Sequence, residues 1–440
     1  MIILKVITAF CILSIMCACN SGNLWAAGEE SASPLFDKAA IIRDLEIKDP
    51  DHNPYVTLDE WLAEAPTPPK GLSDERRAAF YRAWVTLWIN IQPAGGPWWT
   101  KPIICPGDNY RHGIWIWDSA FHIMGLLHGG LKARQLALWQ IEIMLSGQHE
   151  TGKVPREIWR DGPQFLGQHG VQAPGLLTLA ANRLLNVAKS DEERAAVRKA
   201  MADLYPRFVK NHEWFFANVR TDIGLCIWSG WDSGWDTSTR WDKEQAAALD
   251  LSCFLYVDRV ELAQMARTLG MKDEAKQWDA RAVELRDTIR KLHWNEKSGI
   301  YNDVNTDKSI SDSITPAIFW PMWAEVATDN QVINSTKYLN DPQMFASKWP
   351  MPSVALGDKR FNSQGYWRGP TWINLNWIAI RGLQSYGQNR AAAALREKSL
   401  DLVAHTPIIY EYYNPLTGEG LGSRNYGWTA ALYIDLILEP

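Results

Sequence analysis

The sequence lacks a basic excess, a metal-binding histidine pattern and a phosphate-binding glycine motif. Its 440 residues carry 45 Lys and Arg against 50 Asp and Glu, a formal charge of −5 that argues against a nucleic-acid-binding protein. The nine histidines include no His-x-x-x-His pair and no His/Cys cluster, and no glycine-rich phosphate cradle occurs. We therefore expect no metal, no organic cofactor and no nucleic-acid partner.

Cysteine is scarce in the body of the chain, and no calcium-binding loop is complete. If the N-terminal residues are removed before Cys19, the body retains Cys105, Cys226 and Cys253, whose spacing matches neither a zinc site nor a disulfide framework. We expect three buried thiols, with one disulfide as the alternative. Residues 302–307 are rich in Asn and Asp but lack the Gly and the closing Glu of a calcium loop, so a polar turn is predicted there.

The N-terminus has the pattern of an export signal. One positive charge precedes an apolar run over 6–18, which has the length of a signal-peptide core and is too short to span a bilayer comfortably. Residues 16–19 (Met-Cys-Ala-Cys) resemble a bacterial lipobox, so we predict a signal peptide over 1–18 and lipidation of Cys19. Ordinary cleavage near residues 26–27 is the alternative. Either route predicts a protein of the bacterial periplasm or outer membrane, with membrane contact only through the lipid anchor.

The body of the chain has a helical pattern. Residues 19–72 contain Pro-rich and Gly/Ser-containing stretches and are expected to form a tether and a lead-in segment before a single domain over 73–440. Strand-like alternation is scarce, and no repeat of fixed period supports an open superhelical array. We predict an all-α domain of helical hairpins closed on itself. The predicted helices cover 73–88, 116–128, 131–146, 174–187, 190–203, 206–218, 244–269, 272–292, 313–326, 329–340, 371–386, 388–404 and 427–438.

Tryptophan is unusually frequent. The 24 Trp outnumber the 14 Tyr and the 12 Phe, although Leu, Ile and Val fill a core without an N–H to satisfy. Flat indole faces suit stacking on sugar rings, which makes a carbohydrate ligand the first hypothesis. The loops that combine Trp with Gly, Pro, Asp and Asn cover 95–118, 147–173, 226–243, 361–372 and 408–427.

The loop over 226–242 places three aspartates among four tryptophans. A carboxyl group packed against indole is desolvated, which raises its pKa and lets it act as a general acid near neutral pH. Ser-Gly-Trp-Asp occurs twice in tandem, so Asp232 and Asp236 both qualify. The structural alternative is that one of them caps the helix near 244 or pairs with Arg240.

A second carboxylate lies in a tyrosine-rich loop. Glu411 is flanked by three tyrosines and is followed by an Asn-Pro-Leu-Thr-Gly turn. Such a glutamate could deprotonate a water molecule, or it could simply accept hydrogen bonds from the loop backbone. Three more loops combine hydrogen-bonding side chains with indoles ahead of a helix, which suits a polyhydroxyl ligand; they cover 110–119, 147–157 together with 172–174, and 364–372.

These motifs together resemble a known enzyme family. Residues 233–241 (Ser-Gly-Trp-Asp-Thr-Ser-Thr-Arg-Trp) look like the acid-bearing signature of the (α/α)6-barrel glycoside hydrolases of families 63 and 37, which include processing α-glucosidases, mannosylglycerate hydrolases and trehalases. Family 63 fits better, because the Arg-Gly-Pro-Thr-Trp loop and the Asn-Pro-Leu-Thr-Gly turn belong to it. The matching segments also include 115–119, 152–157, 366–372, 410–418 and 426–429, in the order of the family.

The resemblance implies an inverting α-glycosidase built as an (α/α)6 barrel. The register with Arg240 and Trp241 favours Asp236 over Asp232 as the general acid, and Glu411 corresponds to the general base. The chain resembles the shorter mannosylglycerate-hydrolase-like members, which lack an extra β-sandwich, and this suggests a small substrate. The implied substrate-binding residues are Tyr110, Trp115, Trp117, Asp118, Glu157, Gln172, Trp235, Arg240, Trp367, Arg368, Gly369, Trp372, Tyr426 and Trp428.

Three competing functions are less well supported by the sequence. A trehalase would use the same fold and the same two carboxylates. A glycan-binding surface lipoprotein would not need two placed carboxylates. A polysaccharide lyase on a related helical fold would need a Tyr/His or Arg base constellation. We therefore predict hydrolysis of an α-glucosidic or α-mannosidic bond.

Overall fold

The computed structural model describes residues 37–439. The predicted signal peptide, Cys19 and the first part of the predicted tether lie outside the described residues. In the rest of the predicted lead-in segment, α1 (Lys38–Asp44) and α2 (Leu58–Ala63) are helical, and Trp61 of α2 stacks on Trp84 with ring centroids 4.7 Å apart. No helix within residues 37–439 is both long and apolar enough to cross a bilayer.

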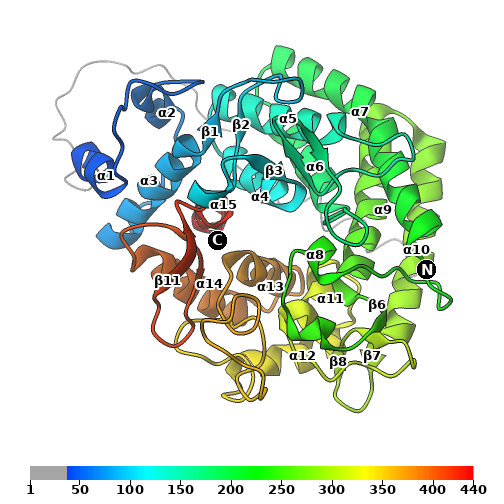
Figure 1. Cartoon of the computed structure of the whole chain (residues 1–440). Helices are drawn as coiled ribbons and strands as arrows, with labels where there is room; N and C mark the ends of the chain where they lie inside the picture. The colour runs from blue at the N-terminus through cyan, green and yellow to red at the C-terminus, as the bar shows by residue number, and fades with distance from the viewer. Residues whose placement is uncertain (1–36, 440) are drawn as a thin grey trace. The chain divides into compact units, whose positions relative to one another are not determined.

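Twelve helices alternate along the chain between an outer and an inner layer (Figure 1). Each inner helix contacts the next inner helix along the chain, and the last inner helix contacts the first. This closed ring confirms the predicted (α/α)6 barrel. The outer helices are α3 (Asp74–Ile89), α5 (Leu131–Ser146), α7 (Asp191–Asn218), α10 (Lys272–Leu292), α12 (Asp329–Lys337) and α14 (Asn389–Ala404). The inner helices are α4 (Ile116–Leu126), α6 (Leu176–Val187), α9 (Leu249–Leu269), α11 (Trp320–Trp323), α13 (Ile373–Ser385) and α15 (Gly427–Leu438).

The residue pattern of each helix matches its layer. All residues of α4 are buried, and α15 is buried from Gly427 to Ile437, as expected of helices with apolar residues on every face. The outer helix α10 instead buries one stripe, at Ala275, Trp278, Ala282, Leu285 and Ile289, and exposes charged residues elsewhere. A spacing of three and four residues places that stripe on one face. The inner helices therefore form the core, and the outer helices shield it.

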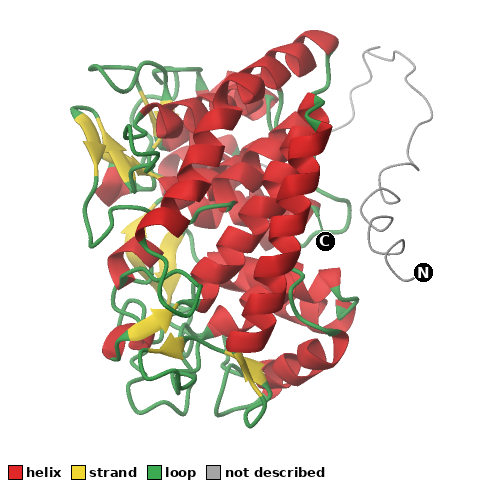
Figure 2. Ribbon diagram, turned by 90° about the vertical axis from the view of Figure 1, so that its right-hand side faces the viewer, coloured by secondary structure: helices red, strands yellow, loops and turns green. Residues whose placement is uncertain are grey.

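The connections at the two ends of the helices differ in length. Outer-to-inner connections are long, such as 147–175 and 219–248, whereas inner-to-outer turns are short, such as 188–190 and 270–271. The strands lie in the long connections and gather with them on one side of the helices (Figure 2). All the loops that the sequence marks as chemically important therefore precede the N-terminus of an inner helix.

The eleven short strands of the described chain form five small antiparallel sheets that tie these loops together. The three-stranded sheet β3–β4–β5 joins 113–115 to 157–164, and the hairpin β10–β11 carries Glu411. The strands are β1 (Ile91–Gln92), β2 (Ile103–Ile104), β3 (Gly113–Trp115), β4 (Glu157–Trp159), β5 (Gly162–Gln164), β6 (Gln245–Ala247), β7 (Trp294–Asn295), β8 (Ile300–Tyr301), β9 (Val304–Asn305), β10 (Tyr410–Tyr413) and β11 (Gly420–Arg424).

Three helix predictions differ from the structure. Within the range predicted as one helix over 313–326, only the 3-10 helix η3 (Pro316–Phe319) and the single turn of α11 (Trp320–Trp323) form. The segments predicted as 190–203 and 206–218 form the single helix α7, which continues through Pro206 because Met201, Tyr205 and Phe208 hold one face in the core. Residues 245–247 form a strand, and α9 begins only at Leu249, whose backbone N–H donates to the Asp303 carboxylate at 2.8 Å. A helix start set by a side chain 54 positions away leaves no local signal.

The three cysteines of the described chain are free and buried. This confirms the expected thiols at Cys105, Cys226 and Cys253 and excludes the alternative disulfide between them. Burial raises the pKa of each thiol above its usual value. They therefore pack as small apolar side chains.

Candidate active site

Backbone hydrogen bonds fix the first two site loops against one another. In the pairing of β3 with β4, Trp115 lies opposite Glu157. The backbone N–H of Ile116 then donates to the carbonyl of Arg156 at 3.0 Å, where α4 begins. The Trp-Asp motif and the Pro-containing loop thus form one rigid wall.

The tandem Ser-Gly-Trp-Asp repeat gives two aspartates with different surroundings. Asp232 forms a capping box with Ser229 at the start of α8 (Gly230–Ser233), and its carboxylate also accepts backbone N–H groups from His169 and Gly170. Both carboxylate oxygens of Asp232 are therefore engaged in holding two loops together. This geometry assigns Asp232 a structural role and leaves Asp236 as the candidate acid.

Glycine is required in both copies of the repeat. Gly234 has φ of +79°, and a Cβ there would lie 3.0 Å from the Trp117 indole and 2.9 Å from the Gln172 side chain. A Cβ on Gly230 would lie 2.6 Å from the carbonyl oxygen of Asp236. Since these distances are below ordinary contact, the glycines allow the acid-bearing loop to approach α4 closely.

Asp236 is a largely buried carboxyl group with few donors. Burial raises its pKa to about 7, and the positive charge of Arg156 opposes this rise. The only side-chain hydrogen bond found for its carboxylate in the described chain comes from the Tyr366 hydroxyl at 3.4 Å. A carboxyl group in this setting retains a proton near neutral pH.

Glu411 is also buried, but two donors support its ionised form. The backbone N–H of Ser423 donates to Oε2 at 2.8 Å, and the Tyr110 hydroxyl donates to Oε1 at 3.2 Å. Burial raises the pKa of Glu411 to about 7, the two donors lower it, and the negative charge of Asp236 raises it further. The backbone bond considered in the sequence analysis is therefore present, together with a second donor.

The two carboxyl groups belong to one electrostatic unit. The negative charges of Glu411 and Asp236 both add to the rise that burial causes in the pKa of Tyr366. Tyr110, which donates to Glu411, also lies within hydrogen-bonding reach of Tyr366. Groups coupled in this way titrate as a pair. The unequal donor sets favour a protonated Asp236 and an ionised Glu411, which are the states of a general acid and a general base.

A column of stacked aromatic rings connects the acid-bearing loop to the base-bearing strand. Trp235 stacks on Trp367, Trp367 on Trp372 at 3.6 Å between centroids, and Trp372 on Tyr412 at 4.5 Å. Trp235 directly precedes Asp236 in the sequence, and Tyr412 directly follows Glu411. These three indoles are fully buried and face each other, so they form the wall of the site and desolvate Asp236 instead of offering open faces to a sugar.

Arg240 is fully buried in a salt-bridge triad. Its guanidinium binds Asp250 through both Nη atoms and Asp303 through Nε and Nη2, at 2.7 to 2.8 Å. The alternative pairing of Arg240 with Asp232 or Asp236 is absent from the described chain. With its donors occupied, Arg240 holds the loop after Asp236 against β9 and α9 and does not face a ligand.

Two further residues predicted to bind substrate are engaged within the protein. Arg368 forms a salt bridge with Asp242, which ties the loop before α13 to the 3-10 helix η2 (Thr239–Asp242). The backbone N–H of Gly369 donates to Ser353 Oγ at 2.9 Å, and a Cβ at this position would collide with the carbonyl of Asn362. Both residues stabilise the loop that carries Tyr366.

The remaining predicted residues surround the acid and the base. The Tyr426 hydroxyl donates to Asp118 at 3.1 Å, and burial raises the pKa of Asp118 well above its usual value. Glu157 accepts from Arg156 at 2.5 Å, and Gln172 accepts the backbone N–H of Trp117. The structure places the other predicted aromatic residues near them, with Tyr110 and Trp115 partly buried and Trp117 and Trp428 buried.

Two residues near the acid were not among those predicted to bind substrate. Tyr366 donates to Asp236, and the charge of Arg156 acts on the same carboxyl group. Both stand beside predicted residues in their motifs, Tyr366 before Trp367 and Arg156 before Glu157. Their positions in those motifs were the available signal.

Cavity size does not identify this site. A surface cavity of about 480 Å³ lies between α7 and the turn from α9 to α10, and a polar one of about 460 Å³ lies beside residues 45–54. Neither is lined by Asp236 or Glu411. The paired carboxyl groups, and not these two cavities, mark the candidate site.

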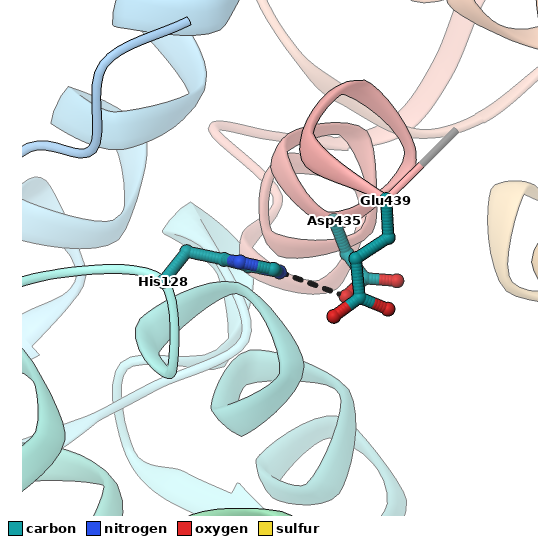
Figure 3. Close-up of side chains that lie close together, drawn as sticks. All are labelled: His128, Asp435 and Glu439. Carbon is teal, nitrogen blue, oxygen red and sulfur yellow. Dashed lines mark hydrogen bonds and ion pairs between the residues drawn. The ribbon is translucent and has the colours of Figure 1, made fainter. Parts of the chain in front are cut away.

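One cluster of possible metal ligands occurs within residues 37–439. Side-chain ligand atoms of His128, Asp435 and Glu439 lie within 4.8 Å of one another (Figure 3). Arg381 and Arg183 also contact both carboxylates, at 2.6 to 4.0 Å. Burial alone would raise the pKa of Asp435, but Arg381, His128 and Arg183 hold it well below its usual range. The cluster is therefore a salt-bridge network that joins inner helices, not a favourable cation site.

Comparisons with known proteins identify glycoside hydrolases as relatives of the chain. Residues 110–429 match the family described as the mannosylglycerate hydrolase MGH1-like glycoside hydrolase domain. The chain is 24% identical over 428 residues to a mannosylglycerate hydrolase from Rubrobacter radiotolerans, covering 78% of this chain and 94% of that protein. It is 24% identical over 416 residues to a periplasmic trehalase from Salmonella schwarzengrund, covering 80% and 70%.

The fold is shared with a solved structure. The GH63 mannosylglycerate hydrolase from Thermus thermophilus, crystallised in complex with glucose, superimposes with a TM-score of 0.69 at 22% identity. The match covers 81% of this chain and 99% of that chain.

Proposed function

The chain belongs to the mannosylglycerate hydrolase MGH1-like family of glycoside hydrolases, as its motifs predicted, and on this premise we propose that it is an inverting α-glycosidase. Its substrate is a small glycoside or oligosaccharide with an α-glucosidic or α-mannosidic bond. Asp236 is the general acid and Glu411 the general base.

The observation that carries this proposal is the unequal support of two buried carboxyl groups. Burial raises the pKa of both groups to about 7, so their hydrogen-bond donors decide which one keeps the proton. Asp236 has one weak donor and lies beside Trp235, which favours its protonated form. Glu411 has two donors, from Ser423 and Tyr110, which favour its ionised form. Two carboxyl groups with opposite protonation states are what an inverting glycosidase requires.

The reaction then follows from the positions of the protons. Asp236 donates its proton to the glycosidic oxygen as the bond from the anomeric carbon to that oxygen breaks. Glu411 takes a proton from a water molecule, whose oxygen attacks the anomeric carbon from the opposite face. The leaving group departs as an alcohol, and the sugar is released with the inverted configuration. The desolvated walls strengthen the interaction of both carboxyl groups with the charged transition state.

Hydrolysis of a substrate panel tests the activity. The panel contains glucosyl and mannosyl disaccharides with α-linkages, trehalose and mannosylglycerate, and NMR follows the anomer of the first product. We expect the β-anomer to form first from an α-linked substrate. Initial release of the α-anomer would refute inversion, and a preference for trehalose would assign the chain a trehalase activity. Binding without release of sugar would instead identify a glycan-binding protein.

Substitution of each carboxyl group tests the assigned roles. We expect Asp236→Asn and Glu411→Gln each to lower kcat by a factor of about 10² to 10⁴, the usual contribution of a general acid or base. Glu419→Gln is the matched control, since Glu419 is exposed in the same hairpin loop. Near-normal turnover by either site variant would contradict the assignment.

We also propose that the protein is exported as a lipoprotein, with residues 1–18 removed and Cys19 lipidated. The proposal rests on the apolar run and the lipobox-like sequence at 16–19. Metabolic labelling with a fatty acid should mark the wild type and not Cys19→Ala. An unlabelled wild-type chain that begins near residue 27 would indicate ordinary signal cleavage.

A further inference from the structure

Trp231 differs from every other tryptophan within residues 37–439, because its side chain is exposed. Its exposed fraction is 57%, whereas Trp235 in the second copy of the same tetrapeptide is completely buried. The other tryptophans of the described chain are buried or partly buried. A single exposed apolar side chain is not unusual by itself, so the surroundings of Trp231 decide whether it can serve a ligand.

The position of Trp231 is well defined. It belongs to α8, whose capping box joins Ser229 and Asp232. The Asp232 carboxylate accepts the backbone N–H of Gly170 at 2.8 Å, and a Cβ on Gly167 would lie 3.3 Å from the Trp231 Cβ. The capping box and the loop over 167–170 therefore fix the backbone and the Cβ from which the indole extends. Such a residue loses little conformational entropy when a ligand stacks on it.

Arg156 connects Trp231 to the acid. Its guanidinium lies 5.3 Å from the Trp231 ring centroid, and Nη1 donates to the Trp231 carbonyl at 3.3 Å. The same guanidinium acts on Asp236 through its positive charge. A general acid protonates the departing oxygen, so the leaving group lies on the side of Asp236. Trp231 is thus on the leaving-group side of the site, and Figure 1 shows α8 toward the middle of the ring of helices.

One polar atom next to this indole has no partner. Arg156 is only 5% exposed, and its Nε finds no hydrogen-bond acceptor in the described chain. Its Nη2 is bound to Glu157, and its Nη1 to the Trp231 carbonyl. The Nε–H, which has no acceptor, can donate to a single hydroxyl group, and Nη1 and Nη2 each already donate to one protein oxygen.

We propose that Trp231 and Arg156 form the leaving-group subsite, and that the leaving group is a pyranose ring that stacks on the Trp231 indole. The inference rests on the glycosidase function proposed above. A pyranose offers an apolar face of C–H groups to the indole and hydroxyl groups to Arg156 Nε. A small acyclic acid such as glycerate has no such face and cannot stack on the indole. The preferred substrate is therefore an α-linked disaccharide.

Kinetics on substrates that share the glycone and differ in the leaving group test this subsite. The substrates are the disaccharide that the wild type cleaves fastest, the methyl α-glycoside of the same sugar, and the glycerate α-glycoside of the same sugar, which is mannosylglycerate when that sugar is mannose. All three need protonation of an alkoxide leaving group, so loss of acid function would affect them alike. Trp231→Ala should lower kcat/KM for the disaccharide at least about tenfold, the factor given by about 1.4 kcal/mol. The methyl glycoside and the glycerate glycoside should change less than about twofold, since neither leaving group has a ring to stack.

Two variants serve as controls. Trp231→Phe keeps a flat apolar face and should restore part of the disaccharide activity. Leu131→Ala removes an equally exposed apolar side chain, 58% exposed, from the start of the outer helix α5, and should leave all three rates unchanged. The pH profile of Trp231→Ala should match that of the wild type, because stacking does not involve a titrating group.

The possible failures are distinguishable. Equal losses on all three substrates, or a shifted pH profile, would show that Trp231 acts through Asp236 and would overturn the inference. Unchanged disaccharide kinetics in Trp231→Ala, or a wild type that prefers mannosylglycerate, would overturn it as well. If the wild type hydrolyses none of the three substrates, the proposed function fails, and the inference fails with it.

Discussion

The hydrogen bond from Tyr110 to Glu411 predicts a specific change in the pH dependence of hydrolysis. Tyr110→Phe removes one of two donors to the carboxylate, at 3.2 Å, and leaves the Ser423 backbone donor in place. A donor to an ionised group stabilises the ionised form, so its removal raises the pKa of Glu411. Since the base acts only when ionised, the acidic limb of kcat/KM should move to higher pH.

The size of the shift follows from the strength of such a bond. Hydrogen bonds to charged groups contribute about 1.5–3 kcal/mol, and the 3.2 Å distance favours the lower end of this range. At about 1.36 kcal/mol per pH unit, the acidic limb should move upward by about one unit. At a pH well below the pH optimum, the ratio of wild-type to variant kcat/KM should therefore be about tenfold larger than at the optimum.

Tyr366→Phe is the matched control on the acid. The Tyr366 hydroxyl donates to Asp236 at 3.4 Å, so its removal also raises the pKa of that carboxyl group. Because the acid acts only when protonated, the alkaline limb should move to higher pH and the acidic limb should stay in place. The longer bond predicts a shift smaller than that of Tyr110→Phe.

Profiles of kcat/KM for wild type and both variants, measured from about pH 4 to pH 10, separate the two limbs. The reasoning is refuted if Tyr110→Phe leaves the acidic limb in place. It is also refuted if the two variants exchange limbs, which would make Asp236 the base and Glu411 the acid. A uniform loss of rate with an unchanged profile would indicate that both phenols only position the substrate.

Two further predictions concern the scaffold of the site. Arg240→Met should lower the free energy of unfolding by about 3–5 kcal/mol, because it leaves Asp250 and Asp303 as unpaired buried carboxylates. The entropy of unfolding is about 2.1 cal/mol/K per residue, so for about 400 residues this loss lowers the Tm by about 4–6 °C. Calorimetry measures the change, and an unchanged Tm would contradict the prediction. Gly234→Ala should lower kcat by about 10², since a Cβ at 2.9 Å from a neighbouring side chain displaces the acid-bearing loop. Gly270→Ala, also at positive φ but with open space around it, should cost about 1 kcal/mol of stability and leave kcat unchanged, so equal effects on kcat would disprove the argument.

Local patterns in the sequence were sufficient to predict the helical architecture. The stripe at Ala275, Trp278 and Ala282 of α10 and the mostly apolar sequence of α4 each indicate their layer. The start of α9 could not be predicted, because Asp303, in the connection between β8 and β9, defines it from 54 positions away. Periodicity thus reveals which faces are buried, whereas helix ends that depend on remote side chains require the folded chain.

The candidate site shows the same division. Asp236 and Glu411 stand out in the sequence as carboxylates among aromatic residues, and the structure brings their loops together. The role of Asp232 was ambiguous, because its partners His169 and Gly170 lie more than 60 positions away. Trp235 was expected to contact substrate, yet its ring is covered by its neighbours. Which face of an indole remains open depends on packing between loops, and a single sequence does not encode that in any local pattern.

The closure of the inner ring by α15 has a consequence for how the molecule folds. The contacts of α15 with α3 and α4 join residues more than 300 positions apart, so they form only after the whole chain is available. Until then the apolar surface of α4 is uncovered, and both Glu411 and Asp118 lack their final surroundings. During synthesis the N-terminal helix pairs can form early, but the enzyme acquires its activity in one late step. Intermediates that wait for α15 expose a large apolar surface and are the species that would aggregate or need a chaperone.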